Sequence, residues 1–166
     1  MHQITIVGDG HLGWAVASAA GELGLRAPVL GRPAAARHDP AAFERTDVAV
    51  DASVGVAVPA NVDAALLAGV RRFVIATTGW AEDRTALDQV LRAHDASAVT
   101  SSNFSLGVAL FGRLVERAAE LFGAVDGFDP YLVEWHRRGK VDRPSATALD
   151  LGRRMVGRHP TLSVLD

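Results

Sequence analysis

The stretch ITIVGDGHLG, residues 4–13, decides the fold that we expect for this chain. Its first four residues are apolar or β-branched, as in a buried strand, and three glycines follow in the pattern G-x-G-x-x-G. Apolar residues then recur at helical spacing as far as Gly24. A strand, a glycine-rich turn and a helix in this order let backbone N–H groups bind a pyrophosphate at the helix N-terminus. The turn residues that we expect at a dinucleotide are Gly8, Gly10, His11, Leu12 and Gly13.

Strands and helices continue to alternate beyond this stretch. Further strands are expected at residues 27–30, 47–52, 73–76 and 98–100. Helices are expected at residues 59–69 and 81–93, with one helical turn near residues 41–44. This alternation predicts a parallel sheet covered by helices on both faces. The predicted fold class is therefore α/β, a Rossmann-type doubly wound parallel sheet over residues 1–104.

The pattern changes after Ser105. A long helix is expected at residues 106–122, where small and apolar residues recur at intervals of three and four. A strand at residues 131–134, a polar loop and a helix that ends near Val156 should follow. We therefore expect a second region at residues 105–166.

The composition excludes several classes of protein. Hydrophobic residues make up 49% of the 166 residues, and the net charge of -2 gives no reason to expect binding to nucleic acid or to an anionic membrane. The chain has no cysteine, which removes disulfides, thiolate metal sites and cysteine nucleophiles. Its six histidines are scattered without ligand spacing, so no metal site is expected. No apolar run is long enough to span a bilayer and no signal pattern is present, so we expect a cytoplasmic protein.

Three loops at later strand ends are candidates for cofactor contacts. The second strand ends at Gly31-Arg32, where a small residue leaves room for a 2′-phosphate and a guanidinium can bind it. This pair favours NADPH, with NADH as the alternative. The loops at residues 77–79 and 101–105 carry hydrogen-bonding residues at the edge of the sheet where such folds bind ligands. Each of these two loops, taken alone, is more often a helix cap or a turn than a ligand contact.

The segment EWHRRGKVDRPSATA, residues 134–148, concentrates polar groups to an unusual degree. His136 can titrate near neutral pH, Lys140 adds a cation, and the hydroxyl groups of Ser145 and Thr147 come just before a helix. A solvated basic loop is one interpretation of this composition. A loop that binds an anion and delivers a proton is the other, and the dinucleotide pattern elsewhere in the chain favours it.

Three motifs resemble those of the dihydrodipicolinate reductase family. TTGW at residues 77–80 is similar to the family's G-T-T-G-[FWY], and NFSLGV at residues 103–108 to its N-F-S-[VIL]-G-V. Residues 134–148 resemble its E-x-H-H-x-x-K-x-D-A-P-S-G-T-A, and the order of the motifs also agrees. The resemblance implies an NAD(P)H-dependent oxidoreductase that transfers a hydride to a cyclic unsaturated imine dicarboxylate in diaminopimelate and lysine biosynthesis.

The resemblance also implies roles for individual residues. His136 would be the proton donor and Lys140 the second catalytic cation. The residues implied at the substrate are Arg137, Ser145, Ala146 and Thr147, the last two through their backbone amides. The residues implied on the nicotinamide side are Ala76, Thr77, Thr78, Ser102, Asn103 and Phe104, with Arg32 at the adenosine ribose or its phosphate. Residues 105–166 would be part of an α+β substrate and oligomerisation domain, so a homo-oligomer is expected.

The chain departs from the family pattern in several places. Arg137 replaces the second histidine, Ala146 replaces a glycine, and the glycine turn is one residue shorter. Family members also continue well beyond residue 166, so the chain is either a fragment or a natural short form, and we expect self-association or poor solubility. Two alternatives therefore stay open: a related reductase for a different cyclic imine, and a dinucleotide-binding module with little or no turnover.

Overall fold

The computed structural model describes residues 2–31, 38–140, 143–159 and 162. It divides into two compact units, Met1–Ser101 and Ser102–Asp166. We call them the N-terminal unit and the C-terminal unit. The sequence places the boundary slightly later, between residues 104 and 105.

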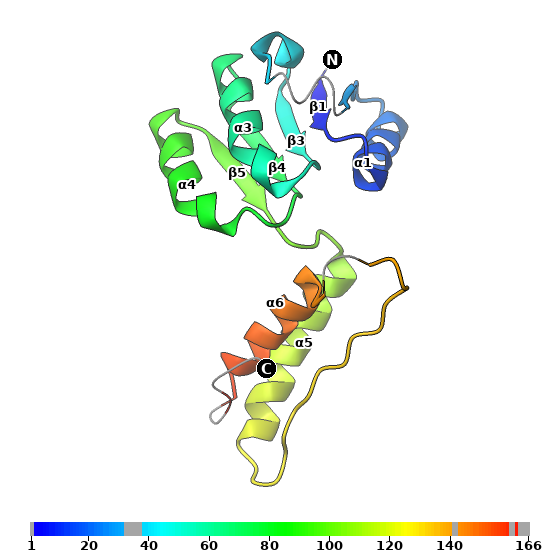
Figure 1. Ribbon diagram of the computed structural model, residues 1–166, viewed down its shortest axis with the longest axis vertical. Coiled ribbons are helices and arrows are strands. Elements are labelled where there is room, and N and C mark those ends of the chain that lie inside the picture. Colours follow the sequence, from blue (N-terminus) through cyan, green and yellow to red (C-terminus); the bar gives the residue numbers. More distant parts are fainter. Residues whose placement is uncertain (1, 32–37, 141–142, 160–161, 163–166) are drawn as a thin grey trace. The chain divides into compact units, whose positions relative to one another are not determined.

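The N-terminal unit is built on one sheet of parallel strands (Figure 1). Its strands are β1 (Ile4–Val7), β2 (Val29–Leu30), β3 (Val48–Asp51), β4 (Arg72–Ile75) and β5 (Ser97–Thr100). Their order across the sheet is β2-β1-β3-β4-β5, so the chain begins near the centre and winds outward in both directions. This arrangement confirms the predicted α/β fold class, and β1 has the predicted bounds.

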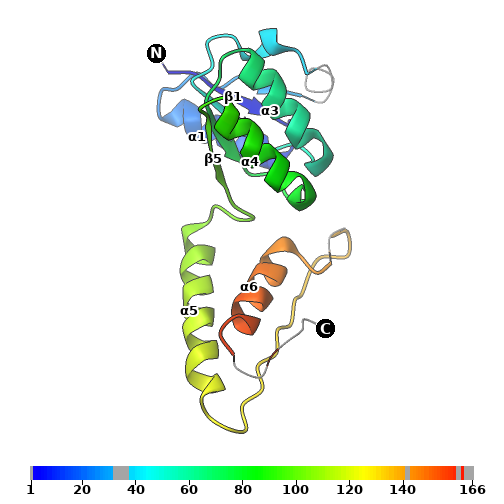
Figure 2. The same cartoon turned by 90° about the vertical axis from the view of Figure 1, so that its left-hand side faces the viewer.

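Helices cover both faces of this sheet. The helices are α1 (His11–Glu22), α3 (Val58–Leu67) and α4 (Arg84–Ala93), with 3-10 turns η1 (Pro40–Phe43), η2 (Gly55–Ala57) and η3 (Ala81–Asp83). In Figures 1 and 2, α3 and α4 lie together on one face of the sheet and α1 lies against the other. The helix expected at residues 81–93 thus begins as a 3-10 turn, and only its later part is α-helical.

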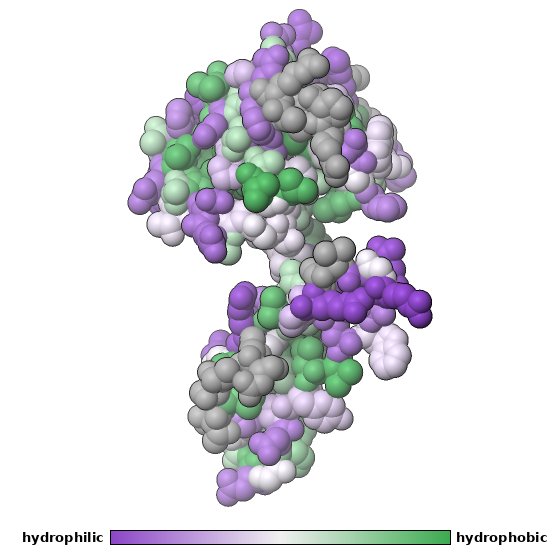
Figure 3. Space-filling model, in the orientation of Figure 1, coloured by the Kyte–Doolittle hydropathy of each residue, from purple (hydrophilic) through white to green (hydrophobic). Residues whose placement is uncertain are grey.

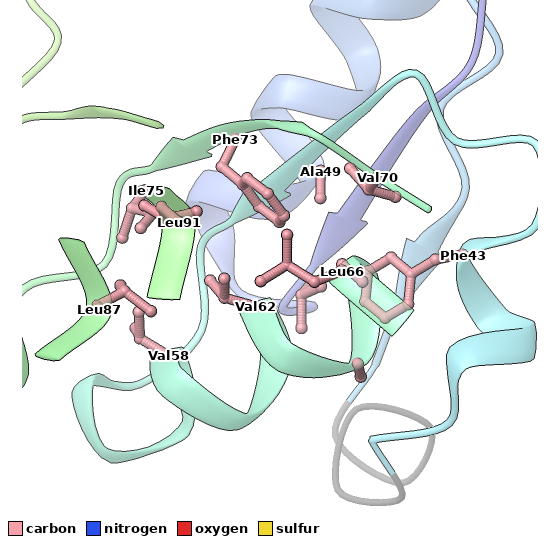
Figure 4. Packing of buried hydrophobic residues seen from close by; sticks show 13 residues of the cluster. Phe43, Ala49, Val58, Val62, Leu66, Val70, Phe73, Ile75, Leu87 and Leu91 are labelled. Carbon is pink, nitrogen blue, oxygen red and sulfur yellow. The ribbon is translucent and has the colours of Figure 1, made fainter. Parts of the chain in front are cut away.

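Apolar side chains fill the space between α3, α4 and the sheet (Figure 4). The main contributors are Val58, Val62 and Leu66 of α3, Leu87 and Leu91 of α4, and Phe73 and Ile75 of β4. Strands that are covered on both faces are expected to be largely apolar, as the inner strands β1 and β3 are. Burial of each such side chain contributes roughly 1.5–3 kcal/mol. This core fixes the carboxyl ends of the central strands, from which the loops of the candidate site begin.

The C-terminal unit is a pair of packed helices, α5 (Leu106–Gly123) and α6 (Ala146–Val156). Arg154 of α6 joins them, because its Nη1 lies 2.7 Å from Glu116 Oε1 on α5 and its Nε lies 2.8 Å from Asp150 Oδ2. Gly112 gives this guanidinium room: a Cβ at that position would lie 3.2 Å from Arg154 Nε. The absence of a side chain at Gly112 of α5 therefore permits the ion pair between Arg154 and Glu116 that joins the two helices.

The prediction of a strand at residues 131–134 is wrong, because the described residues there form no strand. The segment is extended and runs back along α5 toward the loop before α6 (Figures 1 and 2). Its side chains alternate as in a strand, since Tyr131, Val133 and Trp135 are 86%, 74% and 93% exposed. The side chains of Glu134 and His136 are only 20% and 24% exposed. A strand also needs a hydrogen-bonded neighbour, and no other described segment pairs with this one.

The C-terminal unit leaves many large apolar side chains exposed. On α5 these include Leu106, Leu110, Phe111 and Leu114, which lie on a helix that is apolar over much of its surface. Among the described residues, however, no helix combines the length and the apolar character needed to cross a bilayer.

Candidate functional site

The glycine-rich turn between β1 and α1 is held by close backbone contacts. Gly8 has φ +115°, and a Cβ there would lie 2.3 Å from the carbonyl oxygen of Ala52. A Cβ at Gly13 would lie 1.9 Å from the carbonyl oxygen of Gly8, so both positions require glycine. By contrast, a Cβ at Gly10 would meet nothing within 4 Å. Gly8 and Gly13 therefore shape the turn, and Gly10 leaves space beside the start of α1.

The start of α1 suits an anion. Gly10 is the N-cap residue and has no side chain to cap the helix, and the first turn contains no acidic residue. His11 and Leu12 open the helix with exposed side chains, so the first backbone N–H groups and the positive end of the helix dipole are available to a phosphate. The geometry fits the pyrophosphate of a dinucleotide.

Asp9 lies where the adenosine ribose would be expected. A Cβ built on Gly31, just after β2, would lie 2.8 Å from Asp9 Oδ2. Dinucleotide-binding folds often place an acidic residue at the end of this strand, where it binds the ribose hydroxyl groups. Here the carboxyl group comes from the glycine turn instead. Arg32, the candidate for the 2′-phosphate, lies outside the described residues.

A buried polar cluster joins the loops that follow β3 and β4. Ser53 donates to Asp51 Oδ1 through its backbone N–H at 3.0 Å and through its hydroxyl at 2.7 Å. The Thr77 hydroxyl also donates to Asp51 Oδ1, and it accepts from the Ser53 N–H at 2.8 Å. Asn61 of α3 donates to Asp51 Oδ2 at 2.8 Å. We call Asp51, Ser53, Asn61 and Thr77 the Asp51 cluster.

The sequence did not predict this cluster, and the cluster shows that the Thr77 hydroxyl binds another residue of the chain. This hydroxyl is buried and directed at Asp51, whereas Thr78 is exposed and Ala76 is half-buried in the same loop. The one signal in the sequence was a charged residue at the end of an otherwise apolar strand, VAVD. Such a residue is informative only once its partners from other elements are known.

In the C-terminal unit, Asn103 lies next to Thr147. The Asn103 side chain accepts from the Ser105 N–H at 2.8 Å, and its Nδ2 lies 3.5 Å from the Thr147 hydroxyl. The loop before α5 thus meets the first turn of α6. Ser102 and Phe104 are exposed on the same loop, and all these residues belong to the C-terminal unit rather than to the sheet.

Glu134 connects His136 to the start of α6. Ser145 donates to Glu134 Oε2 through its N–H at 2.9 Å and to Oε1 through its hydroxyl, and the same hydroxyl accepts from the Ala148 N–H at 3.1 Å. His136 Nε2 is buried and lies 2.8 Å from Glu134 Oε1. The hydrogen bonds from Ser145, with a smaller effect of His136, hold the pKa of Glu134 below its usual value. Ser145 therefore acts as a helix cap and as an anchor for Glu134.

The basic loop after His136 is held by Arg143. Its Nη2 donates to the carbonyl oxygen of Arg138 at 2.7 Å and its Nε to that of Lys140 at 3.0 Å. The Lys140 N–H in turn donates to the carbonyl oxygen of Arg137 at 3.1 Å. Lys140 is half-buried, whereas Arg137 is exposed.

A groove of about 920 Å³ runs between α5, α6 and the extended segment. Phe111, Phe122, Phe128, Leu151 and Met155 line much of it, and its polar groups include Glu134, His136, Lys140, Ser145 and Thr147. Figure 3 shows hydrophilic residues at the loop before α6 and hydrophobic ones along α5. A mainly apolar groove with a few polar groups is typical of a small-molecule site. Arg137 and Ala146 do not line it, and the described residues contain no cluster of three or more side chains suited to a metal ion.

Comparisons with known proteins agree with this arrangement. The family model described as "Dihydrodipicolinate reductase, N-terminus" matches residues 3–104, and the model "Dihydrodipicolinate reductase, C-terminus" matches residues 107–161. A curated protein from Methanopyrus kandleri, named 4-hydroxy-tetrahydrodipicolinate reductase, is 42% identical over 106 residues, which are 63% of this chain and 38% of that protein. A protein of the same name from Bartonella bacilliformis is 39% identical over 122 residues, 73% of this chain and 44% of that protein.

A solved structure gives the same fold. It is described as dipicolinate bound dihydrodipicolinate reductase from Paenisporosarcina sp. TG-14, with a TM-score of 0.70 and 19% sequence identity. The match covers 100% of this chain and 70% of that one. The matched region is less than half the length of each of the two curated relatives.

Proposed function

Because this chain belongs to the dihydrodipicolinate reductase family, we propose that its function is the NAD(P)H-dependent reduction of 4-hydroxy-tetrahydrodipicolinate in diaminopimelate and lysine biosynthesis. The observation that carries the proposal is the groove of the C-terminal unit. It brings together His136, Lys140 and Thr147, which the family resemblance assigns to proton transfer and substrate binding.

The residues of the groove can supply the chemistry that the substrate needs. Loss of the 4-hydroxyl group as water gives the ring-conjugated imine, and the nicotinamide, when bound, would supply a hydride to it. His136 then protonates the resulting enamine, and Lys140 offsets negative charge on the dicarboxylate. The backbone amide of Thr147, which lines the groove at the positive end of α6, would bind a carboxylate, and that of Ala146, beside the groove, would assist it. Because Nε2 of His136 faces Glu134, proton delivery uses Nδ1 or requires rotation of the ring.

Steady-state oxidation of NADPH with enzymatically generated dihydrodipicolinate tests the proposal. Turnover that is lost in both His136→Gln and Lys140→Ala supports it. Turnover with other cyclic imines alone would support a related reductase, for which Arg137 and Ala146 are the sequence evidence. Cofactor binding without any turnover would support a dinucleotide-binding module.

For the cofactor, we propose a preference for NADPH, with NADH also accepted. Gly31 carries no side chain at the end of β2, and Arg32 provides a cation for the 2′-phosphate. The carboxyl group of Asp9 acts in the opposite sense, because it lies against Gly31 and would repel a phosphate. Dissociation constants for NADPH and NADH, measured side by side, decide the point, and tighter binding of NADH contradicts the preference.

We further propose a cytoplasmic homo-oligomer that associates through the C-terminal unit. The extended segment presents Tyr131, Val133 and Trp135 to solvent, and no described segment pairs with its backbone. Exposed apolar residues on an unpaired extended segment favour association with another chain. Light scattering should show self-association that Val133→Lys weakens. A monodisperse monomer at high concentration contradicts this part of the proposal.

A further inference from the structure

The Asp51 cluster has no role in the function described so far. We propose that Asp51 is a positioning residue for the nicotinamide side of the dinucleotide crevice, and that it acts through Ser53 and Thr77. The inference rests on the proposed binding of a dinucleotide to the N-terminal unit. It centres on Asp51, to which neither the sequence motifs nor the groove of the C-terminal unit points, and it gives Thr77 of the TTGW motif a partner that the motif does not show.

The cluster concentrates hydrogen bonds on one buried carboxyl group. Asp51 Oδ1 accepts from the Ser53 N–H, the Ser53 hydroxyl and the Thr77 hydroxyl, and Oδ2 accepts from Asn61 Nδ2. Asn61 Nδ2 also lies 3.1 Å from the Ser53 hydroxyl. A polar group this deeply buried persists only if its hydrogen bonds are satisfied, so the positions of both loops are tied to Asp51.

The loops after β3 and β4 are also in close backbone contact, so a movement of one displaces the other. A Cβ at Gly55 would lie 2.3 Å from the carbonyl oxygen of Gly79, which places the loop after β3 directly against the loop after β4. The Trp80 indole fixes the second loop further by donating to the carbonyl oxygen of Thr77 at 2.8 Å. The same loop after β3 touches the glycine turn, because Ala52 O is the atom that a Cβ at Gly8 would strike. Displacement of Ser53 or Thr77 would therefore be transmitted to the ligand-binding edge.

The order of the strands gives the cluster its place in the crevice. β2 lies on one side of β1, and β3 and β4 lie on the other. In doubly wound sheets the dinucleotide spans the point where the strand order reverses, with its pyrophosphate at the first glycine turn. The adenosine half then lies over β2, and the nicotinamide half lies over the carboxyl ends of β3 and β4. These are the ends that the Asp51 cluster organises.

Binding of NADH and of ADP-ribose, which lacks the nicotinamide, separates positioning from simple stabilisation. In Thr77→Val, which keeps the shape but loses both hydrogen bonds, we expect the dissociation constant of NADH to rise about tenfold while that of ADP-ribose is unchanged. Asp51→Asn should also raise the dissociation constant of NADH. Thr77→Ser keeps the hydroxyl, so it should bind NADH as the wild-type chain does. Calorimetric titration measures all these constants.

Thr5→Val is the matched control. Thr5 is fully buried in β1 and its hydroxyl lies 2.5 Å from that of Thr46, so the variant also loses a buried hydrogen bond. It should lower the melting temperature without changing the ratio of the two dissociation constants. The proposal would be overturned if the ratio of the dissociation constants of NADH and ADP-ribose were the same in Thr77→Val, Thr5→Val and the wild-type chain. Equal weakening of NADH and ADP-ribose by Thr77→Val would overturn it as well.

Failure of the proposed function has a different signature. If the wild-type chain binds neither ligand, dinucleotide binding is refuted, and the positioning role is then decided by amide hydrogen exchange. Ala57 and Asp83 each donate a backbone hydrogen bond within the two loops, so faster exchange at both in Thr77→Val, but not in Thr5→Val, would show that the cluster still fixes them. Unchanged exchange at both amides would refute the positioning role as well.

Discussion

The two units of this chain differ in how deeply their apolar side chains are buried. In the N-terminal unit, Ile6, Val58 and Ala65 are fully buried, and helices lie against both faces of the sheet. In the C-terminal unit, Leu106, Leu114 and Trp135 are largely exposed, and the candidate residues lie along an open groove. The first unit holds its glycine turn by steric fit, and it also holds the loops after β3 and β4 by the buried hydrogen bonds of the Asp51 cluster. The second holds its candidate residues mainly by a few charged and capping interactions, so changes in the two units should have different consequences.

Steric fit in the N-terminal unit predicts the largest effect on stability. In Gly13→Ala the new Cβ would lie 1.9 Å from the carbonyl oxygen of Gly8, so the turn or α1 must shift. We expect a loss of about 3 kcal/mol or more in the free energy of unfolding, together with loss of dinucleotide binding. Denaturant unfolding of the isolated variant measures the first, and calorimetric titration the second.

Gly21→Ala is the control within the same helix. A Cβ at Gly21 meets nothing within 4 Å, and alanine is the better helix former, so this variant should gain about 0.5–1 kcal/mol. If both variants change stability equally, the close approach of Gly13 to Gly8 does not determine the turn. The contrast between the two units would then lose its basis.

The proposed turnover would depend on the C-terminal unit and should show the next largest effect. His136→Gln removes the proposed proton donor, and we expect kcat to fall by about a hundredfold or more while the dissociation constant of the cofactor stays the same. His94→Gln, at the exposed C-cap of α4, should leave kcat unchanged. A fall in kcat of less than tenfold in His136→Gln would exclude His136 as the essential acid.

The sequence predicted the sheet well because its signals are local. The strand–turn–helix stretch contains its own glycines, and Gly8 and Gly13 prove to have the close contacts that require them. The role of Asp51 could not be predicted, since it depends on Asn61 and Thr77 from other elements. For residues 131–134 the side-chain alternation was present in the sequence, but a strand depends on a neighbour that the pattern does not contain.

Acid should affect the two units through different carboxyl groups. Hydrogen bonds from Ser145 lower the pKa of Glu134, and the backbone N–H of Gln3 lowers that of Asp47. A carboxyl group with a lowered pKa in the folded state stabilises the fold above its unfolded pKa, and this contribution is lost as the pH falls through the folded value. We expect Glu134→Gln to flatten the acid dependence of amide exchange in α6 alone, and Asp47→Asn that of β1 alone. An effect of Glu134→Gln on exchange in β1 would contradict the separation of the units.

The smallest effect concerns Asp9, where the N-terminal unit relies on charge rather than on steric fit. Its carboxyl group lies against Gly31, at the strand end where a 2′-phosphate would be bound. Asp9→Asn removes the repulsion but keeps the size, so the affinity for NADPH relative to NADH should rise by about two- to fivefold. The gain should shrink at high salt, because an exposed charge is screened. Asp95→Asn, an exposed change in the turn after α4, should leave the ratio unchanged. If Asp9→Asn favours NADH instead, the carboxyl group does not face the 2′ position.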